Sequence, residues 1–149
     1  MKTKPAEQKQ HPGEHLGEHP GGYPGTSMLR VHLWLESEGG MLFGLGRVQL
    51  LEMVALHGSL NQAAKVLGMS YRAAWGRIKR TEEALGEKLL VQASGRKGYE
   101  LTPLASELVR NFTAWHQEVE DFALKRARQR LPWDIKGFAA APAPSDPDS

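Results

Sequence analysis

The chain contains no cysteine among its 149 residues. This absence excludes disulfide bonds, thiolate metal sites and cysteine nucleophiles, and it fits a reducing cytoplasm as the simplest compartment. The sequence also lacks any run of about 18 apolar residues, the length that a membrane-spanning helix needs. Its N-terminus lacks the apolar segment of a signal peptide. We therefore expect a cytoplasmic protein that is neither inserted into a membrane nor exported.

The chain has little net charge, +2, because its 19 Lys and Arg residues are nearly balanced by 17 Asp and Glu residues. The distribution is nevertheless uneven, since residues 65–97 hold eight cations and three anions, a net charge of +5. Local charge of this kind favours contact with phosphate groups. With 40% hydrophobic residues, the chain has room for one domain with a modest core, and two domains are not expected.

Residues 59–84 have the pattern of two short helices joined by a tight turn. Ser59 is a good N-cap, and Gln62 three positions later completes a capping box. Gly68 supplies the positive φ that ends a helix, and Ser70 can cap the next one. The segment is therefore predicted to be a helix-turn-helix.

The second of these helices has two different faces. Its predicted core face consists of Ala74, Ile78, Thr81 and Leu85. Its opposite face consists of Tyr71, Arg72, Trp75, Gly76 and Lys79. A narrow, positively charged helix suits a major groove. We predict that this face binds DNA, with Trp75 on the DNA-facing surface rather than in the core. The alternative is an ordinary helical pair with a solvated basic face.

Two further elements are predicted before the helix-turn-helix. Residues 28–35 alternate between apolar and polar side chains, which indicates a half-buried strand that ends at residues 38–40. Its inward side chains are Leu29, Val31, Leu33 and Leu35, and its outward ones are Arg30, His32 and Trp34. A helix is predicted over residues 45–57, ended by Gly58. Its core stripe is Val48, Leu51, Val54 and Ala55.

A hairpin is predicted directly after the basic helix. Residues 87–93 and 98–102 have the pattern of short strands, and residues 94–97 form a cationic tip with a glycine on each side of its basic pair. A hairpin at this place is the wing of a winged helix, and Arg96 and Lys97 are predicted to reach phosphates or a minor groove. A solvated turn is the alternative.

A long helix is predicted from Pro103 to about Arg130, with Thr102 as its N-cap. Its apolar residues recur at alternating spacings of three and four, the pattern of a helix that packs along a partner. Part of this stripe exceeds what the remaining elements can cover, so we predict a homodimer. The predicted dimer interface is Leu108, Phe112, Trp115, Val119 and Phe122.

The two ends of the chain have the composition of disordered tails. Residues 1–27 are rich in Pro, Gly and His, and residues 131–149 are expected to be mostly disordered, with 131–138 docking locally. His11, His15 and His19 recur every four residues and are weak candidates for a metal ion, but the interspersed Pro and Gly argue against a shared helical face. A solvated linker is favoured, and neither a metal site nor a cofactor is expected.

With this order of elements, residues 28–127 resemble the N-terminal DNA-binding domain of ModE-type molybdate-responsive transcriptional regulators, which are relatives of the LysR-type winged helices. The match is carried by the segments MLRVHLWL, GRVQLLEMVALHGSLNQAAKVLGMSYRAAWGRIKRTEEALGEKLLVQASGRKG and LTPLASELV. Its specific part is MSYRAAW, which opens the basic helix. The expected fold is therefore mainly α (α+β), a winged helix-turn-helix over residues 28–130 with an N-terminal strand, a hairpin wing and a long dimerisation helix.

The resemblance also implies a function. It implies a cytoplasmic dimer on a pseudo-palindromic operator, with Ser70, Tyr71, Arg72 and Trp75 at the groove and the wing over the backbone. Full-length regulators of this type carry a second region that binds molybdate or tungstate. The residues after the long helix are not expected to form that region, so direct molybdate sensing is not expected, whereas a tie to molybdenum homeostasis is. The alternative is that an oxyanion binds at a dimer interface lined by Arg or Lys and backbone amides. The sequence does not show where such a site would lie.

Two other functions remain as alternatives at this point. One is a metal-handling protein that uses the histidine tail, and the other is a winged-helix adaptor that binds proteins. An enzyme is not expected, because the sequence offers no nucleophile and base pair, phosphate loop or metal triad. Glu82 and Glu83 are interpreted as a solvated or capping pair.

Overall fold

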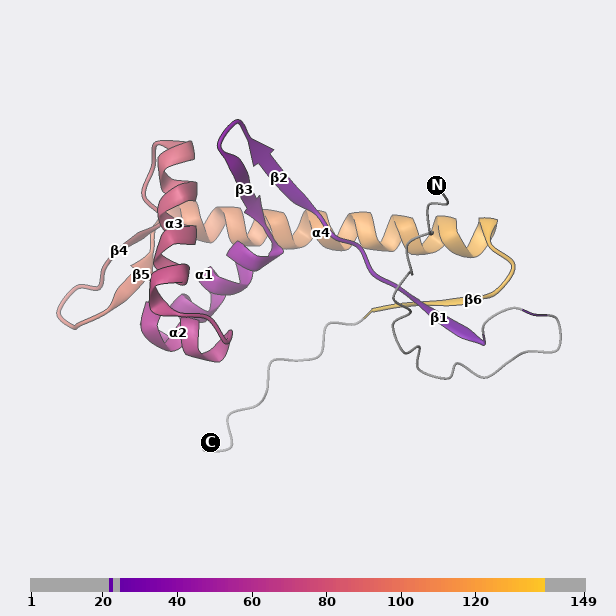
Figure 1. The fold of residues 1–149 in the computed structure, drawn as a ribbon, viewed down its shortest axis with the longest axis horizontal. Coiled ribbons are helices and arrows are strands. Elements are labelled where there is room, and N and C mark those ends of the chain that lie inside the picture. Colours follow the sequence, from indigo (N-terminus) through magenta and orange to yellow (C-terminus); the bar gives the residue numbers. More distant parts are fainter. Residues whose placement is uncertain (1–21, 23–24, 139–149) are drawn as a thin grey trace, which may run out of the picture. The chain divides into compact units, whose positions relative to one another are not determined.

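The computed structural model describes residue 22 and residues 25–138 (Figure 1). The predicted N-terminal tail with His11, His15 and His19 lies almost wholly outside these residues, as does the chain after residue 138. Two compact units are present: residues 31–123 form one, and the described residues among 1–30 and 124–138 form the other. In the described part of the chain, no helix is both long and apolar enough to cross a membrane.

Three helices form the centre of the unit made of residues 31–123: α1 (Leu45–His57), α2 (Leu60–Val66) and α3 (Tyr71–Leu85). Their ends are set by local chemistry. The Ser59 hydroxyl accepts from the Gln62 N–H at 3.2 Å, and the Ser70 hydroxyl accepts from the Ala73 N–H at 3.1 Å. Gly58 closes α1 with a φ of 64°, a conformation that glycine adopts without strain. The predicted helix-turn-helix is confirmed.

The helices share one apolar core, and its largest fully buried aliphatic side chains are Val48, Leu50, Leu51, Val54, Leu60, Ile78 and Leu89. On α1 the predicted core stripe omitted Leu50, which is buried, and was wrong to include Ala55, which is exposed. The reason is that α1 contacts α2, α3, β3 and β5, so more than one of its sides is covered. On α3 the core face is confirmed for Ala74, Ile78 and Thr81, but Leu85 is 37% exposed.

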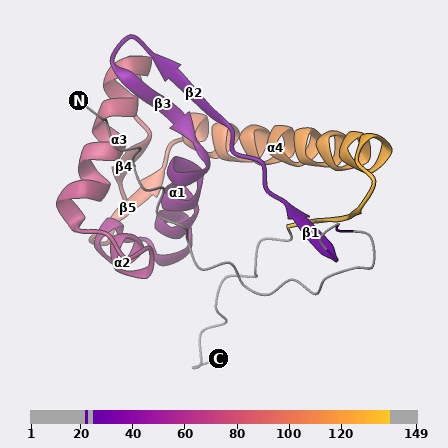
Figure 2. The same ribbon diagram turned by 45° about the vertical axis from the view of Figure 1, so that its right-hand side comes forward.

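An antiparallel hairpin precedes α1, formed by β2 (Trp34–Ser37) and β3 (Gly40–Gly44). The predicted single strand over residues 28–35 was wrong, because residues 30–33 are not part of a strand and Leu35 is exposed. The stretch at Gly39 and Gly40 turns the chain back on itself instead of ending the sheet, and Gly40 has a φ of 109°. The hairpin lies beside α3 in both views (Figures 1 and 2).

The wing consists of β4 (Leu90–Gln92) and β5 (Tyr99–Leu101), paired antiparallel as predicted. It is attached to the helices at two points. The Tyr99 N–H donates to the Gly58 carbonyl at 3.1 Å, and the Leu89 N–H donates to the Glu82 carboxylate at 3.0 Å. Glu82 is only 5% exposed. Its interpretation as a solvated residue was therefore wrong, although it does cap a backbone N–H, and Glu83 is exposed.

The long helix α4 (Pro103–Arg130) begins as predicted, because the Thr102 hydroxyl accepts from the Ala105 N–H at 3.2 Å. Ala105 and Phe112 are its buried residues. The Phe112 ring meets the Phe43 ring edge-on, with 5.5 Å between centroids, which anchors α4 to β3.

The other unit is built around a parallel pair of strands, β1 (Thr26–Leu29) and β6 (Asp134–Gly137). Ile135 is buried, and the Arg128 guanidinium at the end of α4 donates to the Ile135 carbonyl at 2.7 Å. The Arg30 guanidinium lies 4.0 Å from the centre of the Phe138 ring. The local docking expected for residues 131–138 is thus a strand pairing.

Candidate nucleic-acid interface

The exposed face of α3 presents a cation and an aromatic ring near its N-terminus. Tyr71 is 46% exposed, and Arg72 is exposed and forms no ion pair with any described residue. One turn further, a Cβ built at Gly76 would have no atom within 4 Å. This part of α3 therefore offers a free guanidinium next to bare backbone. Ser70 is exposed as well, but its hydroxyl is engaged as the N-cap.

Trp75 does not project freely from this face. It is half-buried, and its ring lies 5.6 Å from the Tyr99 ring of the wing at an interplanar angle of 40°. The Lys79 ammonium lies 4.8 Å from the centre of the Trp75 ring and 3.6 Å from the Glu82 carboxylate. Trp75 thus joins α3 to the wing, with part of its surface left open. Its contact with DNA remains a prediction.

The wing tip carries the two predicted cations, and both are exposed. The Arg96 guanidinium folds back towards the end of α1, since its Nη2 would lie 3.6 Å from a Cβ built at Gly58. Gly98 holds the tip in this place. It has a φ of 120°, and a Cβ there would overlap the Gly58 carbonyl oxygen.

Sequence reasoning missed a group of three arginines, two on α3 and one on α1. Arg77 and Arg80, one turn apart on α3, line a hollow beside the β2–β3 hairpin together with Arg47 of α1. The signal was present, because Arg77 and Arg80 had been counted in the basic stretch and are spaced by three. Nothing in the sequence indicates that Arg47 lies beside them.

Residues 45–106 match the bacterial regulatory helix-turn-helix protein family of the lysR type. They form a LysR-type helix-turn-helix domain. The matched segment begins at the first residue of α1 and ends in the first turn of α4, so it contains all three helices and the wing. This LysR-type domain is the winged helix-turn-helix that the sequence predicted.

Several relatives of the LysR-type domain are molybdenum-related proteins. The chain is 34% identical over 100 residues to the molybdenum transport protein ModE of Azotobacter vinelandii, which covers 65% of this chain and 37% of the relative. It is 45% identical over 53 residues to the dual regulator ModE of Escherichia coli, covering 35% of this chain and 20% of the relative. The matches therefore span little more than a third of these relatives at most.

Solved structures with a similar fold include a complex of the CbnR DNA-binding domain with DNA. Its TM-score is 0.48 at 22% sequence identity, and the match covers 60% of this chain and all of that chain. A complex of the BenM DNA-binding domain with benA site 1 DNA has a TM-score of 0.47 at 20% identity, covering 60% of this chain and 98% of that one.

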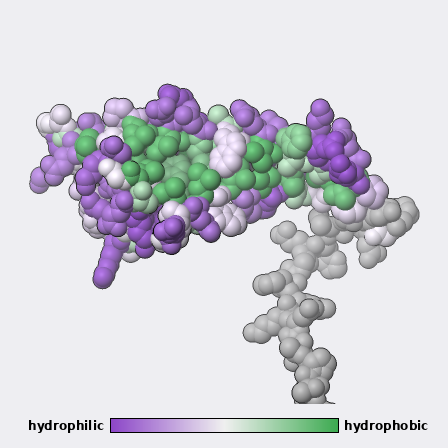
Figure 3. All heavy atoms as spheres, turned by 90° about the horizontal axis from the view of Figure 1, so that it is seen from above, coloured by the Kyte–Doolittle hydropathy of each residue, from purple (hydrophilic) through white to green (hydrophobic). Residues whose placement is uncertain are grey.

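The residues predicted to form a dimer interface follow the LysR-type domain on α4, and the structure divides them. Phe112 is buried in the core of its own chain, and Leu108 and Val119 are half-buried. Trp115 and Phe122 are 38% and 66% exposed. Apolar side chains gather along α4 in the view of Figure 3. A hollow of about 310 Å³ lies beside this helix, and its lining includes Leu85, Leu108 and Trp115.

No metal site is visible in the part of the chain that the structure describes, where no three His, Asp or Glu side chains are grouped to hold an ion. His11, His15 and His19 lie outside these residues, so the weak candidates named from the sequence stay untested.

Proposed function

We propose that the chain is a sequence-specific, DNA-binding transcriptional regulator of the ModE type that acts as a homodimer on a pseudo-palindromic operator. The LysR-type domain and the ModE relatives support this function. The observation that carries it is the exposed face of α3, where the unpaired Arg72 guanidinium stands next to the open backbone at Gly76.

In this proposal, α3 enters the major groove with its N-terminal half. A guanidinium there can bind the O6 and N7 atoms of a guanine with two hydrogen bonds, and an exposed tyrosine can bind a base edge or a phosphate. The missing side chain at Gly76 lets the helix backbone approach the DNA closely. The assigned contacts are Ser70, Tyr71, Arg72, Trp75, Gly76 and Lys79.

The wing extends the contact along the DNA backbone. Arg96 and Lys97 are exposed at its tip and carry charge suited to phosphates. The contact between the Trp75 and Tyr99 rings fixes the base of the wing relative to α3. The helix and the base of the wing would therefore meet the DNA as one preformed surface, with little ordering of either on binding.

Arg72→Ala is the test of this function. We expect operator affinity to fall by about 1–3 kcal/mol, roughly 5- to 150-fold, because a bidentate base contact is lost. The operator is first selected from fragments of the host genome, and affinity is then measured by titration with fluorescent DNA.

Arg110→Ala is the matched control, because Arg110 is also an exposed arginine of residues 31–123 but lies on α4. It is expected to bind like the wild type. Unchanged affinity and unchanged sequence preference in Arg72→Ala would remove the proposed role of this residue.

A homodimer on α4 is the second part of the proposal. The exposed Phe122 and Trp115 rings and the apolar hollow beside α4 support it, because exposed apolar area of this kind marks interaction surfaces. We expect Phe122→Glu to shift the protein from dimer to monomer in sedimentation velocity at micromolar concentration. Thr113→Glu is the control, since Thr113 is exposed and roughly half a turn away around the same helix. A wild-type protein that sediments as a monomer would refute the dimer.

A further inference from the structure

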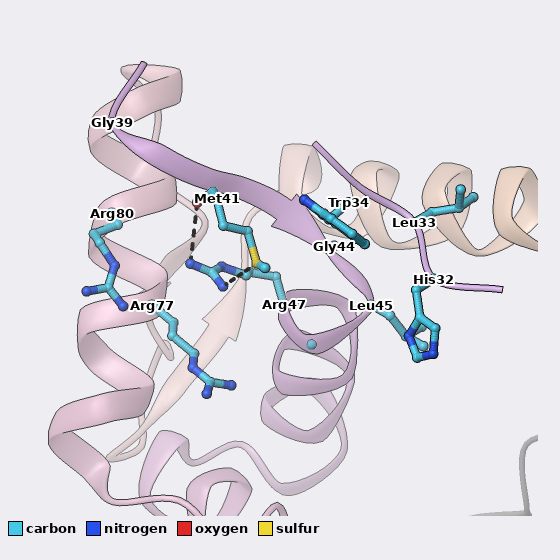
Figure 4. A pocket seen from close by; sticks show the side chains of 11 residues that line it. His32, Leu33, Trp34, Gly39, Met41, Gly44, Leu45, Arg47, Arg77 and Arg80 are labelled. Atoms are coloured by element: carbon cyan, nitrogen blue, oxygen red, sulfur yellow. Dashed lines mark hydrogen bonds between the residues drawn. The ribbon is translucent and has the colours of Figure 1, made fainter. Parts of the chain in front are cut away.

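A second cationic surface lies on the flank of α3 that faces the β2–β3 hairpin. It is a hollow of about 680 Å³ bounded by the hairpin, the start of α1 and α3. Its lining holds three arginines, Arg47, Arg77 and Arg80, and no carboxylate. Figure 4 shows Arg47 reaching towards the hairpin from α1, with Arg77 and Arg80 on the neighbouring helix. Tyr71 and Arg72 do not line this hollow.

Arg47 is a buried cation without an anionic partner. It is 6% exposed, and its contacts are Nη1 to the Met41 sulfur at 3.0 Å and Nη2 to the Met41 carbonyl at 3.5 Å. Its Nε has no hydrogen-bond partner. A thioether is a weak acceptor, so most of the donor capacity of this guanidinium is unused. Burial of a charge in this state is unfavourable unless an anion accompanies it.

Arg77 and Arg80 add further positive charge that no anion of the hollow balances. Neither forms an ion pair within the part of the chain that the structure describes. Burial lowers the pKa of Arg47 from its ordinary value, and the positive charges of Arg77 and Arg80 lower it further. Three like charges thus surround one hollow, and an anion bound there would remove their mutual repulsion.

The first turn of α1 opens into the same hollow. Its N-cap is Gly44, which has no side chain to accept from the free N–H groups, and the first turn holds no acidic residue. Leu45, Gly46 and Arg47 line the hollow. The Arg77 guanidinium lies beside this turn, since its Nη1 would be 3.9 Å from a Cβ built at Gly46. Unsatisfied amides and the positive end of the helix dipole therefore coincide with a guanidinium.

We propose that this hollow binds a tetrahedral oxyanion of the phosphate type, held by the α1 amides and Arg77 and flanked by Arg47 and Arg80. The same chemistry has two sources, a free phosphate ion or a backbone phosphate of DNA. The second source rests on the proposed function, because Arg77 and Arg80 flank the helix that would lie in the groove. The first does not.

The test for a free phosphate ion, the free-ion arm of the experiment, uses the full chain without DNA. We expect the melting temperature in about 10 mM phosphate or sulfate to exceed that in chloride of equal ionic strength by roughly 3 °C. The variant Arg77→Gln/Arg80→Gln should lose this difference, while Arg110→Gln should keep it. Both substitutions lie at solvent-accessible positions of α3, so the double variant is expected to fold.

The DNA arm measures how operator affinity depends on salt. If a backbone phosphate occupies the hollow, the double variant loses about one to two units of the slope of log K against log salt, and Arg110→Gln loses none. A phosphate effect on stability supports the free ion, and a reduced slope without that effect supports the DNA phosphate. Absence of both overturns the site. If the wild type binds no DNA, the proposed function fails and the free-ion arm alone decides the site.

Discussion

Gly98→Ala is expected to destabilise the protein by about 3 kcal/mol or more, the largest effect of any single methyl group in the wing. The added Cβ would overlap the Gly58 carbonyl oxygen, and the backbone at φ 120° is itself strained for any L side chain. The overlap can be relieved only by moving the wing, which breaks the hydrogen bond from the Tyr99 N–H to Gly58. The free energy of unfolding in urea measures the loss.

Gly95→Ala provides the matched control. Gly95 lies in the same hairpin and also has a positive φ, 72°, but a Cβ there would meet no atom within 4 Å. The free energy of unfolding of this variant should fall only by the cost of placing an L residue at a positive φ, about 1–2 kcal/mol. Equal losses for the two variants would show that the contact with Gly58 is not what requires glycine at position 98.

Glu82→Ala is expected to lower the free energy of unfolding by about 2–4 kcal/mol. The Glu82 carboxylate accepts from the Leu89 N–H and lies 3.6 Å from the Lys79 ammonium. Leu89 is fully buried, so its N–H would lose its partner in a place that water does not reach. The measurement is again urea unfolding, followed by circular dichroism.

Glu83→Ala separates this effect from a general effect of removing negative charge. Glu83 is the exposed neighbour on the same helix, and its loss should change the stability by no more than about 0.5 kcal/mol. A Glu82→Ala protein as stable as Glu83→Ala would mean that the carboxylate does not hold β4 to α3.

The helices could be predicted from the sequence because their signals are local. Ser59, Ser70 and Thr102 each cap a helix through a residue three positions on, and all three caps are present. The wing followed from its glycines and its place after α3. Local signals were also what misled at Gly39 and Gly40, where a hairpin turn was interpreted as the end of a strand.

The remaining features depend on contacts between distant residues. Thr26 pairs with Asp134 in the parallel strands, and no residue close to either one in the sequence indicates that pairing. The half-buried state of Trp75 depends on Tyr99, and the burial of Glu82 depends on Leu89. Arg47 joins Arg77 and Arg80 only because the hairpin and α1 are packed against α3. The candidate face of α3 was therefore predictable, and the second cationic hollow was not.

The bond between the Tyr99 N–H and the Gly58 carbonyl gives the wing a particular place in the folding of the domain. It ties β5 to the end of α1, the helix that contacts most of the other elements of its unit. The strands of the wing cannot detach without disturbing the junction between α1 and α2, whereas residues 94–97 at the tip are free of that bond. The base of the wing therefore belongs to the same cooperative opening unit as the helices, and only its tip can rearrange alone.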